Sequence, residues 1–152
     1  MKARRGKPQR GNVLIEFALG WSVLWLLFGG LYQFGYSFFV YNQLQTAVAN
    51  AAELGSKLDY DTSDTGNPTR FQQTLQNMVV YGDETAGTTP IVPGLTTSNV
   101  NVLVTLDAQS IPRDITITIS NYTYSAIFAS FTPLNKPRAT TKYFGEVICS
   151  TC

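Results

Sequence analysis

Hydrophobic and polar residues divide the chain into a long apolar segment near the N-terminus and a mixed C-terminal part. Between residues 13 and 40 the only charged side chain is Glu16, and this run exceeds the roughly 20 residues that a helix needs to cross a bilayer. Residues 41–58 keep a narrower apolar stripe, which is typical of an amphipathic helix covering a globular head; it consists of Leu44, Ala47, Val48, Ala51, Leu54 and Leu58. Because no proline interrupts residues 13–57, the pattern predicts one continuous helix that spans a membrane and then supports the head.

Residues 59–152 carry shorter patterns, beginning with a loop and a short helix. The loop at residues 59–69 contains three aspartates, but the ligand order and closing glutamate of a calcium-binding EF-hand are missing, so a solvated turn is favoured. Asn67-Pro68 then provides an N-cap and a first-turn proline. The apolar face of the predicted helix, which stops at Gly82, consists of Phe71, Leu75, Met78 and Val79.

Alternating apolar positions in the C-terminal half predict β-strands. Residues 100–106 and 115–119 alternate on either side of a turn at residues 111–114. Residues 122–131 are aromatic and apolar and are expected to extend the second strand before turning against the helix, while residues 138–148 can form a last strand. A small antiparallel sheet laid on the long helix is the simplest way to bury these faces, so the sequence predicts an α+β fold.

Six aromatic residues recur at intervals of three and four along the apolar segment, which places them on one face of a helix. They are Trp21, Trp25, Phe28, Tyr32, Tyr36 and Phe39. In one interpretation the rings face lipid tails. In the other they pack against further transmembrane helices, with the glycines at positions 20, 29, 30 and 35 allowing close approach. The second interpretation favours assembly over a lone anchor.

The charges are distributed unevenly along the chain. Five of the 11 basic residues precede residue 11 without an acid among them, so this segment should stay unfolded on the cytoplasmic side, which retains positive charge. The other six basic residues face all 10 acids, which argues against nucleic acid as a partner. The apolar run is too long for a cleaved secretory signal, and no small-residue cleavage motif follows residue 40. We therefore expect the helix to remain in the working protein.

The sequence offers little for catalysis or metal binding. It contains no histidine, which removes the usual general base and the usual nitrogen ligand of zinc. It also has no phosphate-binding glycine loop. We therefore expect no catalytic residues, no metal site, no cofactor and no enzymatic activity.

Cys149 and Cys152 are the two cysteines of the chain and lie among its last residues. A thioredoxin-type motif needs its first cysteine at a helix N-terminus, and we expect no helix after Cys149. Zinc would need two further ligands from a second chain. A short-loop disulfide in an oxidising compartment is the favoured interpretation, with free thiols as the next alternative.

Glu16 is the anomaly of the apolar segment, because an acid inside a bilayer costs free energy. In the simpler interpretation its side chain reaches back to the lipid headgroups. In the other, a peptidase cuts after Gly11 and exposes the protonated α-amino group of Asn12, one helical turn before Glu16. The carboxylate would then pair with this amine in the same chain or in a neighbouring chain.

At these residues the sequence resembles a known family. A basic leader ending in glycine, a glutamate five residues later and a long apolar helix are similar to the signal of type IV prepilins and pseudopilins. The likeness is greatest to the TadE-like proteins of tight-adherence (Flp) pilus systems, at Arg10-Gly11-Asn12-Val13-Leu14-Ile15-Glu16-Phe17-Ala18-Leu19, Gly30, Gln33-Phe34-Gly35, Gln43-Leu44-Gln45-Thr46-Ala47 and Ala49-Asn50-Ala51-Ala52. It covers about the first third of the chain. The chain departs from the family at Gly20-Trp21-Ser22, where a proline is frequent, and at Gln33, where an acid is frequent.

The resemblance implies a type IV pilin-like fold in four segments: a leader in residues 1–11, a transmembrane helix in 12–40, its amphipathic continuation in 41–58, and a head in 59–152. By the same resemblance, Gly11 is the last leader residue, Asn12 the first mature residue, and Glu16 the acid needed for processing and assembly. The implied partners are a prepilin peptidase, other pilin-like subunits, the pilus assembly platform of the inner membrane, and the lipid bilayer.

We therefore expect a pseudopilin or minor pilin with a role in pilus biogenesis and adhesion. It would be a single-pass protein of the bacterial inner membrane, with a cytoplasmic N-terminus and a periplasmic head, and a candidate for incorporation into an extracellular pilus. The alternative is an uncleaved signal-anchored surface protein whose head binds a ligand or partner; it predicts an intact leader and no requirement for Glu16. A membrane-tethered redox protein would instead depend on Cys149 and Cys152.

Overall fold

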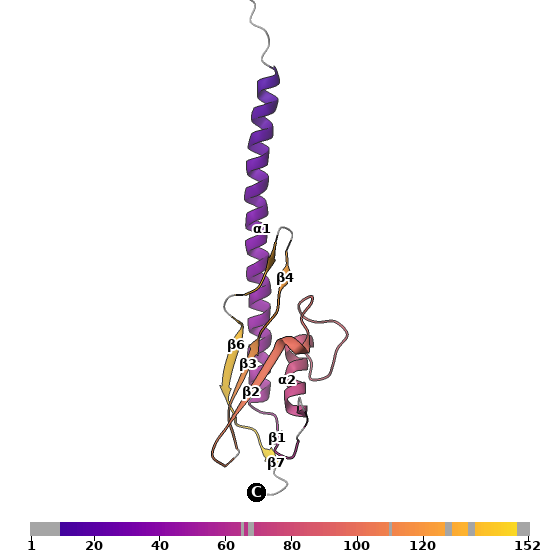
Figure 1. The fold of residues 1–152 in the computed structure, drawn as a ribbon, viewed down its shortest axis with the longest axis vertical. Helices are drawn as coiled ribbons and strands as arrows, with labels where there is room; N and C mark the ends of the chain where they lie inside the picture. The colour runs from indigo at the N-terminus through magenta and orange to yellow at the C-terminus, as the bar shows by residue number, and fades with distance from the viewer. Residues whose placement is uncertain are drawn as a thin grey trace, which may run out of the picture.

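The computed structural model describes residues 10–64, 66, 69–109, 111–126, 129–133 and 136–148, with side chains from residue 13 onward. Its dominant element is α1, Arg10–Gly55, a helix of 46 residues that projects from the head as a stalk (Figure 1). The predicted continuous helix is confirmed, although it ends at Gly55, ahead of residues 57 and 58. The packing at this end is tight, because a methyl group on Gly55 would lie 3.0 Å from Leu75 Cδ1.

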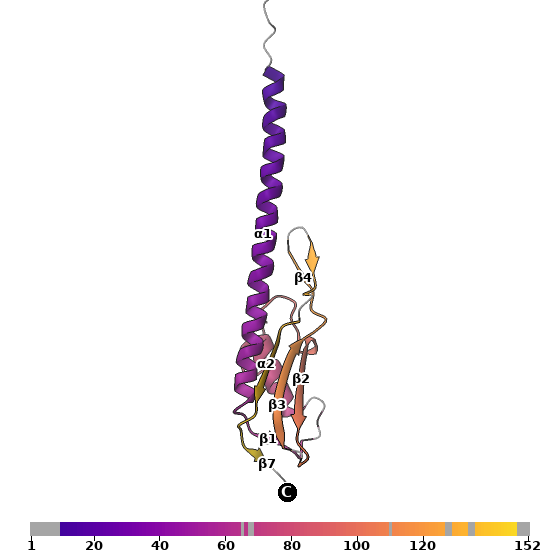
Figure 2. The ribbon, with the colours of Figure 1, turned by 90° about the vertical axis from the view of Figure 1, so that its left-hand side faces the viewer.

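The head is built around the C-terminal part of α1. Burial on this helix begins at Val40. Of the predicted apolar stripe, Leu44, Ala47, Val48 and Ala51 are buried, and Leu54 and Leu58 are half-buried against them. The remaining elements lie beside this part of α1 in both views and leave the N-terminal part of the helix standing alone (Figures 1 and 2).

The second helix, α2 (Arg70–Tyr81), follows the acidic loop. Thr69 is its N-cap: the Thr69 hydroxyl accepts the Gln72 N–H, and the Gln72 amide oxygen accepts the Thr69 N–H, which makes a capping box. The cap therefore lies two residues beyond the predicted one, and residues 67 and 68 themselves lie outside the described residues. Gly82 ends the helix with a left-handed φ of 75°, which glycine adopts without strain, so the predicted stop is confirmed.

Three antiparallel strands form the main sheet in the order β2-β3-β6. They are β2 (Val100–Leu106), β3 (Pro112–Ile119) and β6 (Arg138–Lys142), and the short 3-10 helix η1 (Thr97–Asn99) leads into β2. Two further strands, β1 (Tyr60–Asp61) and β7 (Val147–Ile148), pair in parallel, and β4 (Tyr124–Ser125) and β5 (Ser130–Phe131) form a separate hairpin. The predicted α+β fold with a small antiparallel sheet is confirmed.

The chain after β3 differs from the sequence expectation in two places. Residues 122–131 do not extend β3, because Asn121 adopts a left-handed φ of 56° and turns the chain toward α1. Residues 138–148 form two strands instead of one. The chain leaves the sheet after β6 because the Phe144 N–H donates to the Ser56 carbonyl at 2.9 Å, at the end of α1.

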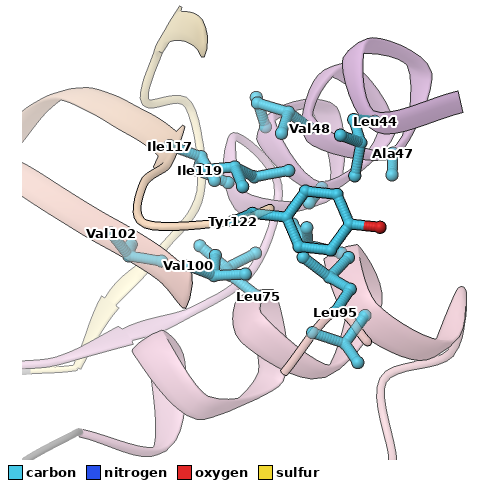
Figure 3. Packing of buried hydrophobic residues seen from close by; sticks show 14 of the residues in the cluster. Leu44, Ala47, Val48, Leu75, Leu95, Val100, Val102, Ile117, Ile119 and Tyr122 are labelled. Atoms are coloured by element: carbon cyan, nitrogen blue, oxygen red, sulfur yellow. The ribbon is translucent and has the colours of Figure 1, made fainter. Parts of the chain in front are cut away.

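The core lies between α1, α2 and the inner face of the sheet (Figure 3). Leu44, Leu75 and Ile117 come from these three layers and are each 0% exposed; burying such a side chain contributes about 1.5–3 kcal/mol. Tyr122 packs among them, and its hydroxyl donates to the Pro93 carbonyl at 2.9 Å. Burial raises the pKa of Tyr122 to about 12, so the hydroxyl keeps the proton that it donates.

Glutamine side chains of the helices bind both edges of the sheet. On the β2 edge, Gln76 Nε2 donates to the Val100 carbonyl at 3.1 Å and Gln72 Nε2 to the Val102 carbonyl at 3.5 Å. On the β6 edge, Gln45 Nε2 of α1 donates to the Arg138 carbonyl at 3.1 Å. Since unpaired strand edges invite pairing with other chains, these bonds both hold the sheet on the helices and protect its edges.

Candidate membrane helix and assembly surface

The N-terminal part of α1 exposes a continuous apolar surface. Residues 13–32 are all exposed except for half-buried Gly29, and their large apolar side chains include Leu26, which is 75% exposed. Soluble proteins rarely expose a contiguous apolar surface of this size to water. Within the described residues, α1 is the one helix that is long and apolar enough to cross a membrane. This surface therefore has the length and composition of a membrane span.

Two serine hydroxyls of this helix find hydrogen-bond partners within the helix itself. The Ser22 hydroxyl donates to the Ala18 carbonyl at 2.8 Å, and the Ser37 hydroxyl donates to the Gln33 carbonyl, also at 2.8 Å. Such bonds to the preceding turn satisfy hydroxyls where water is absent. The serines are thus compatible with a lipid environment, whereas the charge of Glu16 would need a partner there.

Glu16 has an exposed side chain and lies one helical turn after Asn12. The backbones of Gly11 and Asn12 belong to the first turn of α1. The leader up to residue 9 and the side chains of residues 10–12 lie outside the described part of the chain. Cleavage between Gly11 and Asn12, and pairing of the new amine with Glu16, therefore stay predictions.

The six aromatic residues of the predicted helix face fall into two groups in the structure. Five are exposed along α1 and are called the aromatic stripe: Trp21, Trp25, Phe28, Tyr32 and Phe39. Tyr36 is half-buried and packs edge-to-face against Tyr124 of β4, with their ring centroids 6.4 Å apart. Tyr36 therefore holds the head against the helix, whereas the aromatic stripe is open to lipid or to another helix.

A shallow groove continues the aromatic stripe toward the C-terminal end of α1. Phe39 lines the groove, and polar residues follow it at helical spacing on the same face: Asn42, Gln43, Thr46 and Asn50. Ile91, from the loop after α2, also lines it. The sequence patterns missed this groove, because periodicity indicates only a solvated helix face and the position of Ile91 depends on tertiary packing.

The carboxylates of the acidic loop are bound by groups of the same loop and of α2. Asp61 accepts the Ser63 hydroxyl at 2.5 Å and the Ser63 N–H at 2.8 Å. Asp64 accepts the Arg70 N–H at 2.6 Å and the Gly66 N–H at 3.0 Å. These hydrogen bonds hold the pKa of both carboxyls below its usual range. The described residues contain no group of three potential metal ligands from histidine, cysteine, aspartate and glutamate.

Cys149 and Cys152 follow β7 directly in the sequence but lie outside the described residues. The disulfide between them stays a prediction. The neighbouring backbone is fixed, because the Tyr60 N–H donates to the Glu146 carbonyl at 2.9 Å and the Thr62 N–H to the Ile148 carbonyl at 3.1 Å.

Comparison with protein families gives a match that coincides with α1. Residues 11–53 match the family model of the TadE-like proteins. None of the curated proteins and none of the solved structures compared with the chain matches it. The matched segment contains the apolar span, Glu16 and most of the helix that supports the head, which together describe a single-pass membrane protein. Over this segment the chain is similar to the TadE-like family, a likeness that suggests involvement in tight-adherence pilus systems.

Proposed function

We propose that this chain is a pseudopilin or minor pilin subunit of a tight-adherence pilus system, involved in pilus biogenesis and adhesion. The observation that carries the proposal is the agreement between the TadE-like match at residues 11–53 and α1, Arg10–Gly55. The helix is exposed and apolar in its N-terminal part and carries the head on its C-terminal part. One part of the helix can thus lie in a membrane while the other part carries the head. This arrangement suits a subunit that is anchored in the bilayer before assembly and is then assembled through its helix.

Assembly through α1 requires both charge pairing and complementary packing between the surfaces of neighbouring helices. A charge in an apolar environment is tolerated when a partner of opposite charge lies next to it. The Glu16 carboxylate would bind the α-amino group of Asn12 on a neighbouring subunit after the leader is removed. The aromatic stripe would then pack against neighbouring helices, and the groove beside Phe39 and Ile91 extends the same face toward the head.

The proposal places the N-terminus in the cytoplasm and the head in the periplasm of a bacterial cell. Its partners are a prepilin peptidase that cuts after Gly11, other pilin-like subunits and the assembly platform of the inner membrane. The head, residues 59–152, would be the part presented outward when the subunit enters a pilus. The basic residues that precede the helix support this orientation, since positive charge is retained on the cytoplasmic side.

The first test is the intact mass and N-terminal sequence of the protein recovered from its native membrane. We expect a chain that begins at Asn12, with or without an added N-methyl group, because the peptidase would remove the basic leader. A chain that keeps the residues up to Gly11 would contradict the proposal. That result would favour the uncleaved signal-anchored protein whose head binds a ligand or partner.

A further inference from the structure

The exposed length of α1 indicates where the bilayer ends. Residues 13–32 number 20 and precede Gln33, whose side chain hydrogen-bonds to the head. At the helical rise they span about 30 Å, which equals the thickness of the hydrocarbon core. A bilayer that begins at Val13 therefore ends near Tyr32 and Gln33, about two turns before the burial at Val40.

The β4-β5 hairpin lies at this level of the helix. Gln33 Nε2 donates to the Ala129 carbonyl at 3.4 Å, and the Tyr36 ring packs on the Tyr124 ring. The hairpin is closed by a bond from the Ala126 N–H to the Ala129 carbonyl at 3.0 Å. Both views show it extending from the head along α1, toward the part of the helix that stands alone (Figures 1 and 2). The head therefore reaches back to the level at which such a bilayer would end.

The chemistry of the hairpin suits the boundary between lipid and water. Residues 115–135 contain no charged side chain. Aromatic rings form a connected series from the helix into the hairpin, with centroids 6.2–6.4 Å apart: Tyr32, Tyr36, Tyr124 and Phe131. Tyrosine is enriched at membrane interfaces, because its ring enters the apolar layer while its hydroxyl stays hydrated.

Hydroxyl groups of the hairpin are paired with one another across its two strands. Ser125 Oγ lies 3.0 Å from Ser130 Oγ, and Thr123 Oγ1 lies 2.8 Å from Thr132 Oγ1. Such pairing reduces the cost of moving the hydroxyls out of bulk water. Phe131 stacks on Tyr124 but remains 41% exposed. The hairpin thus presents an uncharged surface on the membrane side of the head.

We propose that the β4-β5 hairpin lies in the outer interfacial layer of the bilayer, where phospholipid headgroups and the first acyl carbons cover it. Ala129 and Phe131 contact lipid together with Tyr32 of α1. The hairpin thereby sets how deeply α1 sits and how the head is oriented over the membrane. This inference rests on the membrane anchoring of α1 and is independent of the role in a pilus.

Fluorescence quenching in vesicles tests this placement. The full chain carries Cys149→Ser and Cys152→Ser, and one new cysteine labelled with an environment-sensitive dye is placed at Ala129→Cys in the hairpin. Gln109→Cys, in the exposed turn between β2 and β3, is the matched control on the head, and Leu24→Cys is the control inside the span. Each protein is reconstituted into vesicles of phosphatidylcholine and phosphatidylglycerol that carry nitroxides at the headgroup or along the acyl chain.

We expect the label at Ala129→Cys to emit at shorter wavelength than the label at Gln109→Cys and to lose fluorescence to headgroup nitroxides. The label at Leu24→Cys should be quenched by acyl-chain nitroxides. Iodide dissolved in the buffer quenches labels that are exposed to water. If iodide quenches the labels at positions 129 and 109 equally, and nitroxide lipids do not quench the label at 129, the proposal is overturned. A blue shift at 129 without lipid quenching also overturns it and indicates a protein partner, such as a second copy of the chain. An unquenched Leu24→Cys label overturns both the hairpin placement and the membrane anchoring.

Discussion

Gly145 lies where the C-terminal part of the chain passes the end of α1. A methyl group added there would overlap the Leu58 carbonyl oxygen and would approach the Tyr143 hydroxyl to 2.7 Å. That hydroxyl lies 2.9 Å from the Leu58 carbonyl and 2.7 Å from the Glu146 carbonyl. The absence of a side chain at one residue therefore allows the pairing of β7 with β1.

Gly145→Ala should destabilise the head by about 1–3 kcal/mol, because the added methyl group meets a backbone atom that cannot move alone. Chemical denaturation of the full chain in detergent, followed by near-ultraviolet circular dichroism, measures the change. Glu146→Ala, at the exposed neighbouring position, is the control and should leave the unfolding free energy nearly unchanged. An unchanged free energy in Gly145→Ala would show that the β1-β7 pairing tolerates the methyl group.

Glu16 and Glu53 are the two acids of α1, and they allow a matched test of the proposed assembly. Glu16→Gln keeps the shape of the side chain and removes the charge, so we expect a large loss of the subunit from cross-linked assemblies while it still inserts into the membrane. Glu53→Gln removes a charge that is paired with Lys57 at 2.9 Å on an exposed surface, and assembly should be retained. The readout is the fraction of the subunit cross-linked to other pilin-like proteins. Normal cross-linking of Glu16→Gln would contradict the charge-pairing mechanism.

At the scale of elements, the start of α2 shows how a loop and a helix stabilise each other. In the Thr69 capping box, the Thr69 hydroxyl accepts a backbone N–H of the first helical turn. The Asp64 carboxylate accepts a second one, the Arg70 N–H. Negative charge at a helix N-terminus is favourable, because the exposed N–H groups there carry partial positive charge. The hydrogen bonds from the Arg70 and Gly66 N–H groups hold the pKa of Asp64 below its usual value of 3.8.

A lowered pKa in the folded state means that the stabilisation by Asp64 is complete above pH 3.8 and is lost as the pH falls through the folded value. We expect Asp64→Asn to reduce stability at neutral pH and to make the remaining stability less sensitive to acid. Denaturant unfolding at several pH values between neutral and strongly acidic measures both effects. An equal loss of stability on acidification in wild type and Asp64→Asn would exclude this carboxylate as a source of the acid sensitivity.

Helix periodicity identified α1 and α2 and their apolar faces, because helical spacing reports which side of a local segment is buried. Alternation likewise identified β2 and β3. It could not identify the turn at Asn121, since that residue leaves the sheet through an uncommon left-handed backbone. Nor could it separate β6 from β7, because the bond between Phe144 and Ser56 joins residues far apart in the sequence.

At the scale of the whole molecule, the chain is adapted to two solvents. The N-terminal part of α1 exposes apolar side chains, whereas the C-terminal part buries them against α2 and the sheet. The same kinds of residue therefore have different roles in the two parts. In the head they drive folding by leaving water, and in the stalk they favour transfer of the helix into lipid.

Leu75→Ala should destabilise the head by about 2–5 kcal/mol, because Leu75 is fully buried where α2 meets the end of α1. Leu26→Ala makes the same chemical change on the exposed part of α1 and should leave the unfolding free energy of the head unchanged. The two variants are compared by denaturation in detergent. Similar destabilisation by both would indicate that the span and the head do not behave as separate environments.

The sequence alone determined the long helix, its apolar and amphipathic parts, the short second helix, the antiparallel strands and the TadE-like segment, because these features depend on local periodicity and local motifs. Only the tertiary structure decided which aromatic residue of α1 contacts the head, which strand pairs with β1, and where the β4-β5 hairpin lies. Each of these depends on contacts between residues far apart in the chain. A period along the sequence shows that a face is buried but not which distant segment covers it.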